Sequence, residues 1–198
     1  MSKTLEFYFD FVSPYSYLAM TQLPEFLQKN PADLVFKPVF LGALHQAQDM
    51  PSPAFIPNKA KWIHRDCHLW ADHYQVPLAW PKQFPFNTMF LLRATIYLQQ
   101  SQPEKLAQFV EQTFNAIWQN GLDVNDEQAV SQHLLALGFD LADIQQGCQQ
   151  QAVKDALKNS VTDAHGLGMF GLPAFKVADD VFFGQDRLMF VEKALAAH

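Results

Sequence analysis

Apolar and polar residues alternate without interruption in the segment 5–11, which reads LEFYFDF. A repeat of two residues is typical of a β-strand, because successive side chains of a strand point to opposite faces of the sheet. The four apolar residues share one face. Since the other face carries Tyr8 between two acidic residues, we expect this strand to be central in its sheet.

The following segments complete a strand–helix–strand unit. Residues 15–28 have apolar side chains at helical spacing, with Pro24 as a possible kink. Ser13 followed by Pro14 is the arrangement expected of an N-cap and the first helical position. Segment 34–41, LVFKPVFL, predicts a second strand. A βαβ unit of this kind is parallel and right-handed in nearly every known case.

The middle of the chain, from about residue 58 to residue 166, changes to a helical pattern that prolines and glycines interrupt. Strand patterns return only afterwards. The helices that this pattern predicts cover residues 62–74, 88–99, 104–118, 127–137 and 141–159.

The last third of the chain predicts a hairpin and a closing helix. Segments 174–177 and 181–183 flank a three-residue connection, and residues 187–197 have helical spacing. The order of the whole chain is then βαβ, a helical stretch, and ββα. This order predicts an α/β protein with a thioredoxin-like fold that a mostly helical inserted domain interrupts.

This order also predicts a discontinuous domain. We expect residues 1–57 and 167–198 to form the thioredoxin-like domain, and residues 58–166 to form the helical insertion.

Charge and hydropathy exclude several partners. The 198 residues are 49% hydrophobic and carry a formal net charge of −6, without a run of basic residues. Tight binders of nucleic acid or of anionic membranes need a basic surface, so we expect neither partner. No apolar run approaches the roughly 20 residues of a membrane span. Because Glu6 and Asp10 interrupt the first apolar stretch, no export signal is expected, and the cytoplasm is the expected compartment.

Thiol and metal chemistry find little support in the sequence. Cys67 and Cys148 are the two cysteines, and no CxxC pair occurs, which excludes a disulfide-stapled scaffold and dithiol redox chemistry. We expect both to be small buried hydrophobic residues. His64 and His68 have the i, i+4 spacing of a zinc pair on one helix face. Arg65 stands where a zinc protease has its glutamate, however, and we expect no metal site.

Three loops are expected to meet if the thioredoxin-like order is correct. In the first, Ser13 begins a helix whose free backbone N–H groups favour an anion, although such a serine is also a common helix cap. In the second, the Leu172–Pro173 bond is either a cis peptide that aims backbone groups at an extended ligand, or trans at the start of a strand. In the third, Gln185 and Asp186 bind an amino or amide group, or Asp186 caps the closing helix.

Five motifs carry a family resemblance: FYFDFVSPYSYLA, PNKAKW, FPFNT, GLPAFKV and FFGQDRL, in this order along the chain. Together they resemble the glutathione-dependent 2-hydroxychromene-2-carboxylate isomerases. These enzymes belong with the kappa-class glutathione transferases to the DsbA-like branch of the thioredoxin superfamily. The resemblance spans almost the whole chain and implies the same fold that the hydrophobic pattern predicts.

The resemblance implies that glutathione is the cofactor and supplies the thiol that the chain lacks. Ser13 stands where redox relatives have a reactive cysteine, and it would hydrogen-bond the glutathione sulfur at a helix N-terminus that lowers the thiol pKa. The Leu172 backbone would pair with the cysteinyl backbone, and Gln185 with Asp186 would hold the γ-glutamyl end. The implied glutathione-binding residues are Ser13, Pro14, Tyr15, Lys59, Leu172, Pro173, Gln185 and Asp186, with Ser13 also catalytic.

The resemblance also implies where a small aromatic carboxylate substrate binds. Lys59 would lie near the glycine carboxylate of glutathione or near the acidic substrate, and Asn87 would be a further polar contact. The loop 45–51 departs from the family pattern of Gly-Asn before a proline pair, and Asp49 is the nearest substitute for that asparagine. We therefore expect Asn87, Lys59 and Asp49 around the substrate.

The implied activity is a reversible isomerisation in the catabolism of aromatic compounds. The enzyme would interconvert 2-hydroxychromene-2-carboxylate and trans-o-hydroxybenzylidenepyruvate through a glutathione thiolate adduct, since addition removes the double-bond character that blocks rotation. Two alternatives stay open: a kappa-like glutathione transferase or peroxidase acting on other electrophiles, and a non-redox thioredoxin-fold module that binds peptides. Relatives are commonly dimers, so a homodimer is expected.

Overall fold

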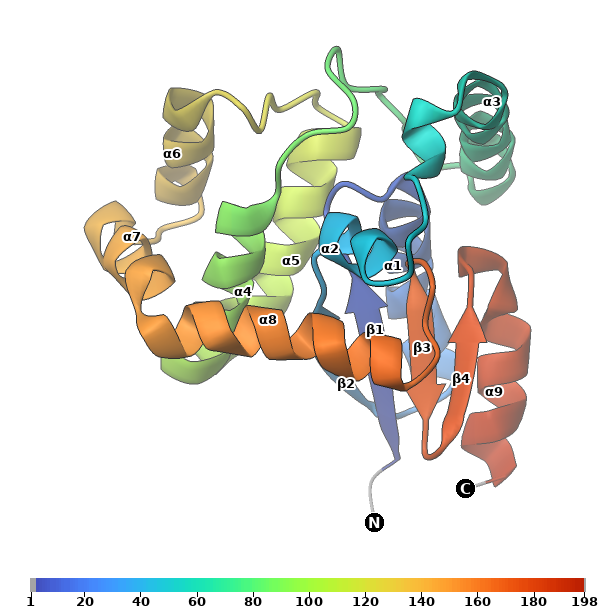
Figure 1. The fold of residues 1–198 in the computed structure, drawn as a ribbon. Helices are drawn as coiled ribbons and strands as arrows, with labels where there is room; N and C mark the ends of the chain where they lie inside the picture. The colour runs from blue at the N-terminus through green and yellow to red at the C-terminus, as the bar shows by residue number, and fades with distance from the viewer. Residues whose placement is uncertain (1–2, 198) are drawn as a thin grey trace.

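The computed structural model describes residues 3–197, so the ends of the predicted outer domain, Met1, Ser2 and His198, lie outside it (Figure 1). A four-stranded mixed sheet has the order β2-β1-β3-β4. β1 is parallel to β2 and antiparallel to β3, and β4 closes the hairpin. The central position predicted for the first strand is therefore confirmed. The strands are β1 (Thr4–Phe9), β2 (Asp33–Pro38), β3 (Ala174–Val177) and β4 (Asp180–Phe183).

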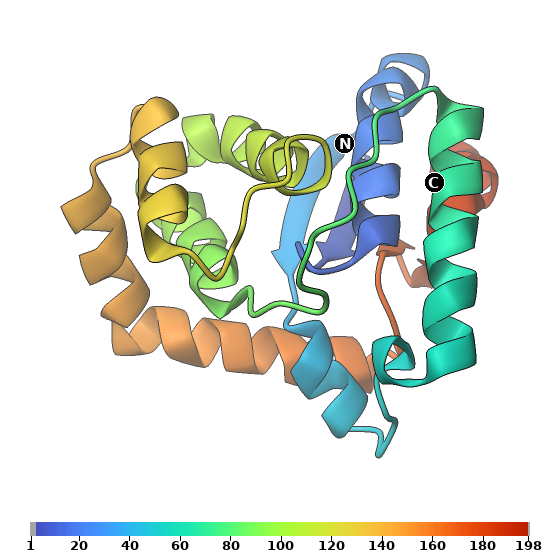
Figure 2. The same ribbon diagram turned by 90° about the horizontal axis from the view of Figure 1, so that it is seen from above.

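The helices surround this sheet on both sides. Figures 1 and 2 show α4 to α7 gathered to one side of the sheet and α3 and α9 at the other, with α8 running between the two groups. No helix among residues 3–197 combines the length and hydropathy that crossing a membrane requires. The helices are α1 (Pro14–Lys29), α2 (Leu41–Gln46), α3 (Pro57–Tyr74), α4 (Met89–Ser101), α5 (Pro103–Trp118), α6 (Glu127–Ala136), α7 (Leu141–Gln149), α8 (Gln151–Gly166) and α9 (Leu188–Ala197), with 3₁₀ turns η1 (Pro53–Phe55) and η2 (Gln185–Arg187).

Several element boundaries differ from those that the pattern predicts. The second strand ends at Pro38, and the short helix α2 follows where a strand end and a loop were expected. The single helix predicted over 141–159 is two helices, because Gln150 has an extended ψ of 135° that interrupts the helical hydrogen bonding. α3 begins five residues earlier than expected, at Pro57, where the missing N–H of proline costs nothing. Pro24, by contrast, lies within an uninterrupted α1.

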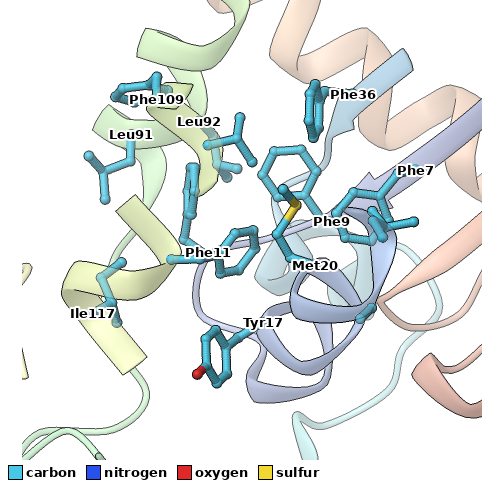
Figure 3. Close-up of a cluster of buried hydrophobic side chains, with 14 of the residues drawn as sticks. Phe7, Phe9, Phe11, Tyr17, Met20, Phe36, Leu91, Leu92, Phe109 and Ile117 are labelled. Carbon is cyan, nitrogen blue, oxygen red and sulfur yellow. The ribbon is translucent and has the colours of Figure 1, made fainter. Parts of the chain in front are cut away.

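One hydrophobic core joins the sheet to the helices on its flank. Figure 3 shows Phe7, Phe9 and Phe11 from the first strand and the loop after it meeting side chains of α4 and α5. The ring centroid of Phe11 lies 4.8 Å from the ring centroid of Phe114 and 6.2 Å from that of Phe109. The division of the chain at residues 57/58 and 166/167 stays a prediction, since buried residues of both predicted domains belong to this core.

Candidate active site

The three predicted loops meet at the carboxyl end of β1. The Ser13 hydroxyl donates a hydrogen bond to the carbonyl oxygen of Leu172, at 3.0 Å. The N–H of Gly184 donates to the carbonyl oxygen of Pro173, also at 3.0 Å. The Leu172–Pro173 peptide bond is cis, which is the first of the two alternatives that the sequence left open. The first loop thus contacts the second, and the second contacts the third.

Ser13 is both the cap of α1 and the polar group of this junction. Its Oγ accepts a hydrogen bond from the N–H of Ser16 at 3.1 Å, and Pro14 takes the first helical position. The side chain is buried, and so is the hydroxyl of Ser16, whose Oγ has no hydrogen-bond partner. The free N–H groups of the first helical turn therefore lie beside a hydroxyl that can be turned towards an acceptor entering the site.

A cavity of about 260 Å³ opens beside Ser13, and we call it the Ser13 cavity. Its lining includes residues at the start of α1, in α2, η1 and α3, and in neighbouring loops, and these elements can be followed in Figure 2. No aspartate, glutamate, lysine or arginine is among the described residues that line it. Its walls are mainly apolar, which suits an aryl group and strengthens any polar interaction made inside. The apolar lining includes Val12, Leu41, Met50, Ile63, Phe84, Phe170, Leu172 and Phe183.

His45 also lines this cavity, a position that no pattern in the sequence predicts. The residue lies on the short helix α2, is 7% exposed, and leaves its Nδ1 buried without a hydrogen-bond partner. Burial lowers the pKa of the imidazole from its ordinary value of 6.5. A lone histidine within an unpredicted six-residue helix gives no periodic signal from which its place could have been deduced.

Asp10 is a second polar group of the site that was not predicted from the sequence. Its carboxylate is fully buried and accepts hydrogen bonds from the Thr88 hydroxyl at 2.6 Å, the Leu41 N–H at 2.8 Å and the Val12 N–H at 3.1 Å. Burial raises the pKa of Asp10 to about 6, although these hydrogen bonds act to lower it. The carboxylate thereby ties the Ser13 loop to the first residue of α2.

Gln185 and Asp186 lie in η2, directly after the loop that contacts Pro173. Gln185 is buried, and its Oε1 accepts a hydrogen bond from the Tyr74 hydroxyl at the end of α3. Burial, assisted by the charge of Asp186, raises the pKa of Tyr74 to about 12. Asp186 forms an ion pair with the adjacent Arg187, a partner that was not predicted from the sequence.

The three residues expected around the substrate do not line the Ser13 cavity. Lys59 is exposed in the first turn of α3, and Asp49 is exposed with a positive φ of 52°. Asn87 accepts a hydrogen bond from the Met89 N–H and lines a different cavity, of about 600 Å³, beside α4 and α7. Met50, which follows Asp49, reaches the Ser13 cavity instead.

Neither cysteine lies in the site, as expected. Cys67 and Cys148 are unpaired and buried, and burial raises the pKa of both thiols, that of Cys148 to about 12. The His64 and His68 rings lie 4.5 Å apart on α3. No group of three or more potential metal ligands is found within residues 3–197. The chain therefore offers no reactive thiol of its own at the Ser13 cavity.

Comparison with known proteins gives the family. The DSBA-like thioredoxin domain matches residues 4–196. The 2-hydroxychromene-2-carboxylate isomerase of Sphingobium xenophagum is 31% identical over 98% of this chain and 99% of its own length. Rat glutathione S-transferase kappa 1 is 26% identical over 94% of this chain and 88% of its own length.

A solved 2-hydroxychromene-2-carboxylate isomerase structure matches with a TM-score of 0.86 and 25% identity, over 98% of this chain and 95% of that one. At this coverage, the matches take in the strands, the cis-proline loop and the helical segment alike. The chain belongs to the DsbA-like thioredoxin family and, within it, to the 2-hydroxychromene-2-carboxylate isomerase family.

Proposed function

We propose that this protein is a glutathione-dependent isomerase that interconverts 2-hydroxychromene-2-carboxylate and trans-o-hydroxybenzylidenepyruvate. The observation that carries the proposal is the Ser13 hydroxyl, at the N-terminus of α1 and 3.0 Å from the carbonyl oxygen of Leu172, in a cavity that no cysteine lines. The relatives named for this isomerisation support the choice of reaction.

The residues around the cavity fit glutathione. The His45 Nδ1 is a buried polar atom without a partner on a residue that lines this cavity, and a polar ligand would satisfy such an atom. The Leu172 backbone precedes a proline and faces the Ser13 loop, where the peptide backbone of an extended tripeptide would pair with it. Bound there, glutathione supplies the nucleophilic thiol that the chain lacks.

Ser13 and the first turn of α1 then stabilise negative charge on the sulfur. The Ser13 hydroxyl turns from the Leu172 carbonyl towards the sulfur, while its Oγ continues to accept from the N–H of Ser16. The free N–H groups and the dipole of α1 add to this stabilisation. The apolar walls exclude water and hold the aryl group of the substrate next to Ser13.

The residues implied for the two charged ends of glutathione lie near opposite ends of α3. Gln185 and Asp186 are held near Tyr74, and Lys59 lies fifteen residues earlier, about 22 Å along the helix axis. An extended tripeptide spans at most about 11 Å. A tripeptide held at Gln185 and Asp186 therefore covers only about half of this separation. We expect Lys59→Ala to weaken glutathione binding less than Asp186→Ala.

Calorimetry with glutathione, followed by the ring-opening assay on 2-hydroxychromene-2-carboxylate with and without thiol, tests the proposal. We expect binding and turnover that requires glutathione. Turnover of general electrophiles without turnover of the chromene would favour a kappa-like transferase, the activity named for the 26% identical relative. Absence of glutathione binding would reject both the isomerase and the transferase hypothesis and would favour a peptide-binding module.

A further inference from the structure

Four side chains with polar atoms line the Ser13 cavity, and three of them have hydrogen-bond partners in the protein. Ser13 contacts Leu172 and Ser16. The Tyr15 hydroxyl donates to Asp66 on α3, at 2.8 Å, and the Ser52 Oγ accepts from the N–H of Ala54. The fourth side chain is His45, whose Nδ1 has no partner.

His45 also differs from the other three in acid–base chemistry. Among the described residues that line the cavity, it is the one side chain that exchanges a proton near neutral pH, because serine does not and burial raises the pKa of Tyr15 far above its ordinary value of 10.0. A thiol that becomes a nucleophile must release a proton, and the Ser13 hydroxyl is no base at neutral pH.

We propose that the imidazole of His45 accepts the thiol proton of glutathione bound in the Ser13 cavity. The S–H bond breaks, an N–H bond forms on the imidazole, and the electron pair stays on the sulfur, so the net charge of the site does not change. The same proton returns to the sulfur when glutathione leaves. This assignment rests on the proposed function, and it adds a proton acceptor to the charge stabilisation that Ser13 supplies.

The surroundings of His45 suit this role. Burial alone lowers its pKa, so the imidazole is neutral at pH 7 and able to accept a proton. α2 carries no other titratable side chain, and the carboxylate of Asp10 accepts a hydrogen bond from the N–H of its first residue. Asp49 lies on the loop after α2, and Asp163 and His165 lie on α8, which packs against α2; all three are exposed. A negatively charged sulfur within the cavity would be the partner that stabilises the imidazolium, as in thiolate–imidazolium pairs.

Two measurements on wild type and His45→Asn test the inference. The ultraviolet absorbance of the thiolate shows whether bound glutathione is deprotonated at neutral pH. Calorimetry in buffers of different ionisation enthalpy counts the protons that binding releases. We expect the wild type to show the thiolate band with a release of about zero protons. In His45→Asn, either the band is lost or about one proton per site appears in the buffer.

Matched controls separate this role from a general loss of the site. His133→Asn removes another histidine whose pKa burial lowers, on α6 and outside the Ser13 cavity, and it should match the wild type in both measurements. S-methylglutathione has no thiol proton, so its binding and proton count should be the same in wild type and His45→Asn.

The outcomes are distinct. If wild type and His45→Asn show the same band and release the same number of protons, or if bound glutathione keeps its proton in the wild type, the role of His45 is wrong and the isomerase proposal stands. If the wild type binds no glutathione, the proposed function fails together with the inference.

Discussion

At the scale of single residues, Ser13 combines a structural and a chemical task in one oxygen atom. The oxygen accepts a hydrogen bond from the N–H of Ser16, which caps α1, and the same hydroxyl donates a hydrogen bond to the carbonyl oxygen of Leu172. Accepting and donating use different parts of the hydroxyl, so the cap can persist when the proton turns to another acceptor. Removing the hydroxyl therefore has two separable consequences.

Ser13→Ala should lower both stability and turnover. Loss of the N-cap costs about 1 kcal/mol of unfolding free energy. Loss of a hydrogen bond to a charged sulfur, worth about 1.5–3 kcal/mol, should lower glutathione-dependent kcat/KM by about 10- to 100-fold. Asp126→Ala removes the side-chain cap of α6, outside the Ser13 cavity, and should cost similar stability with unchanged kcat/KM. Equal loss of activity in both variants would remove Ser13 from the mechanism.

The buried carboxyl of Asp10 should make stability depend on pH. Its pKa is about 6 in the folded protein against an ordinary value of 3.8, so between these values the folded state holds a proton that the unfolded state has released. The unfolding free energy should then fall as the pH rises through this range, by up to about 1.4 kcal/mol per pH unit.

Chemical denaturation at several pH values between about 4 and about 6 measures this slope. Asp10→Asn cannot exchange this proton, so its slope should be flatter than that of the wild type. Asp179→Asn, in the exposed turn before β4, should keep the wild-type slope. Identical slopes for wild type and Asp10→Asn would contradict the assignment of the raised pKa.

At the scale of elements, the site depends on how closely the third loop approaches the second. Gly184 has a φ of +112°, which lies in a region of backbone conformation that is essentially restricted to glycine. Its N–H donates a hydrogen bond to the carbonyl oxygen of Pro173. A Cβ on Gly184 would lie 2.7 Å from the Asp186 carboxylate. The glycine therefore sets the position of the acidic residue proposed to hold the γ-glutamyl end.

Gly184→Ala should weaken glutathione binding as well as stability. We expect a loss of about 1–3 kcal/mol of unfolding free energy from the strained backbone. Displacement of Asp186 should raise the Kd for glutathione about tenfold, as for one lost charge-assisted hydrogen bond. Gly138→Ala has a positive φ of 79° and an added Cβ with nothing within 4 Å, so it should cost stability but leave the Kd unchanged. Calorimetry with glutathione measures the Kd of both variants and tests this difference.

Local patterns predict elements well where the pattern is long, and poorly elsewhere. The alternation in β1 and the cap before α1 suffice to predict both elements, and the thioredoxin-like order brings Ser13 to the cis-proline loop. α2 spans six residues, fewer than two helical turns, so its apolar spacing does not repeat. The break at Gln150 interrupts an apolar pattern that continues on both sides, so the pattern does not reveal it.

The missed residues of the site depend on contacts between distant parts of the chain. Asp10 finds its partners Leu41 and Thr88 at separations of 31 and 78 residues. His45 is buried and lines the same cavity as Ser13. No residue near it in the sequence indicates this position. The roles of Lys59, Asn87 and Asp49 came from family resemblance and stay predictions.

At the scale of the whole molecule, the helical segment and the sheet share one core that also supports the site. The indole N–H of Trp118, at the end of α5, donates to the carbonyl oxygen of Phe11 at 2.9 Å, two residues before Ser13. The Phe114 ring packs on Phe9 and Phe11. The helical segment therefore contacts the loop that carries Ser13 directly, through α5.

Phe114→Ala should destabilise the whole chain in one transition. Truncation of this fully buried ring costs about 3–5 kcal/mol of unfolding free energy. Because both parts share the core, far-ultraviolet circular dichroism and tryptophan fluorescence should follow a single denaturation curve, shifted to lower denaturant. Two separated transitions would show that the predicted insertion 58–166 unfolds independently.

The burial of Cys67 and Cys148 has a practical consequence for chemical labelling. Alkylating reagents attack thiolates, and the raised pKa values of both buried thiols leave almost no thiolate on the folded chain at neutral pH. The folded protein should therefore be nearly inert to iodoacetamide. In a mixture with a thiol ligand, the rate of alkylation then reports the ligand alone, and its change on addition of protein measures how far the site exposes or protects that sulfur.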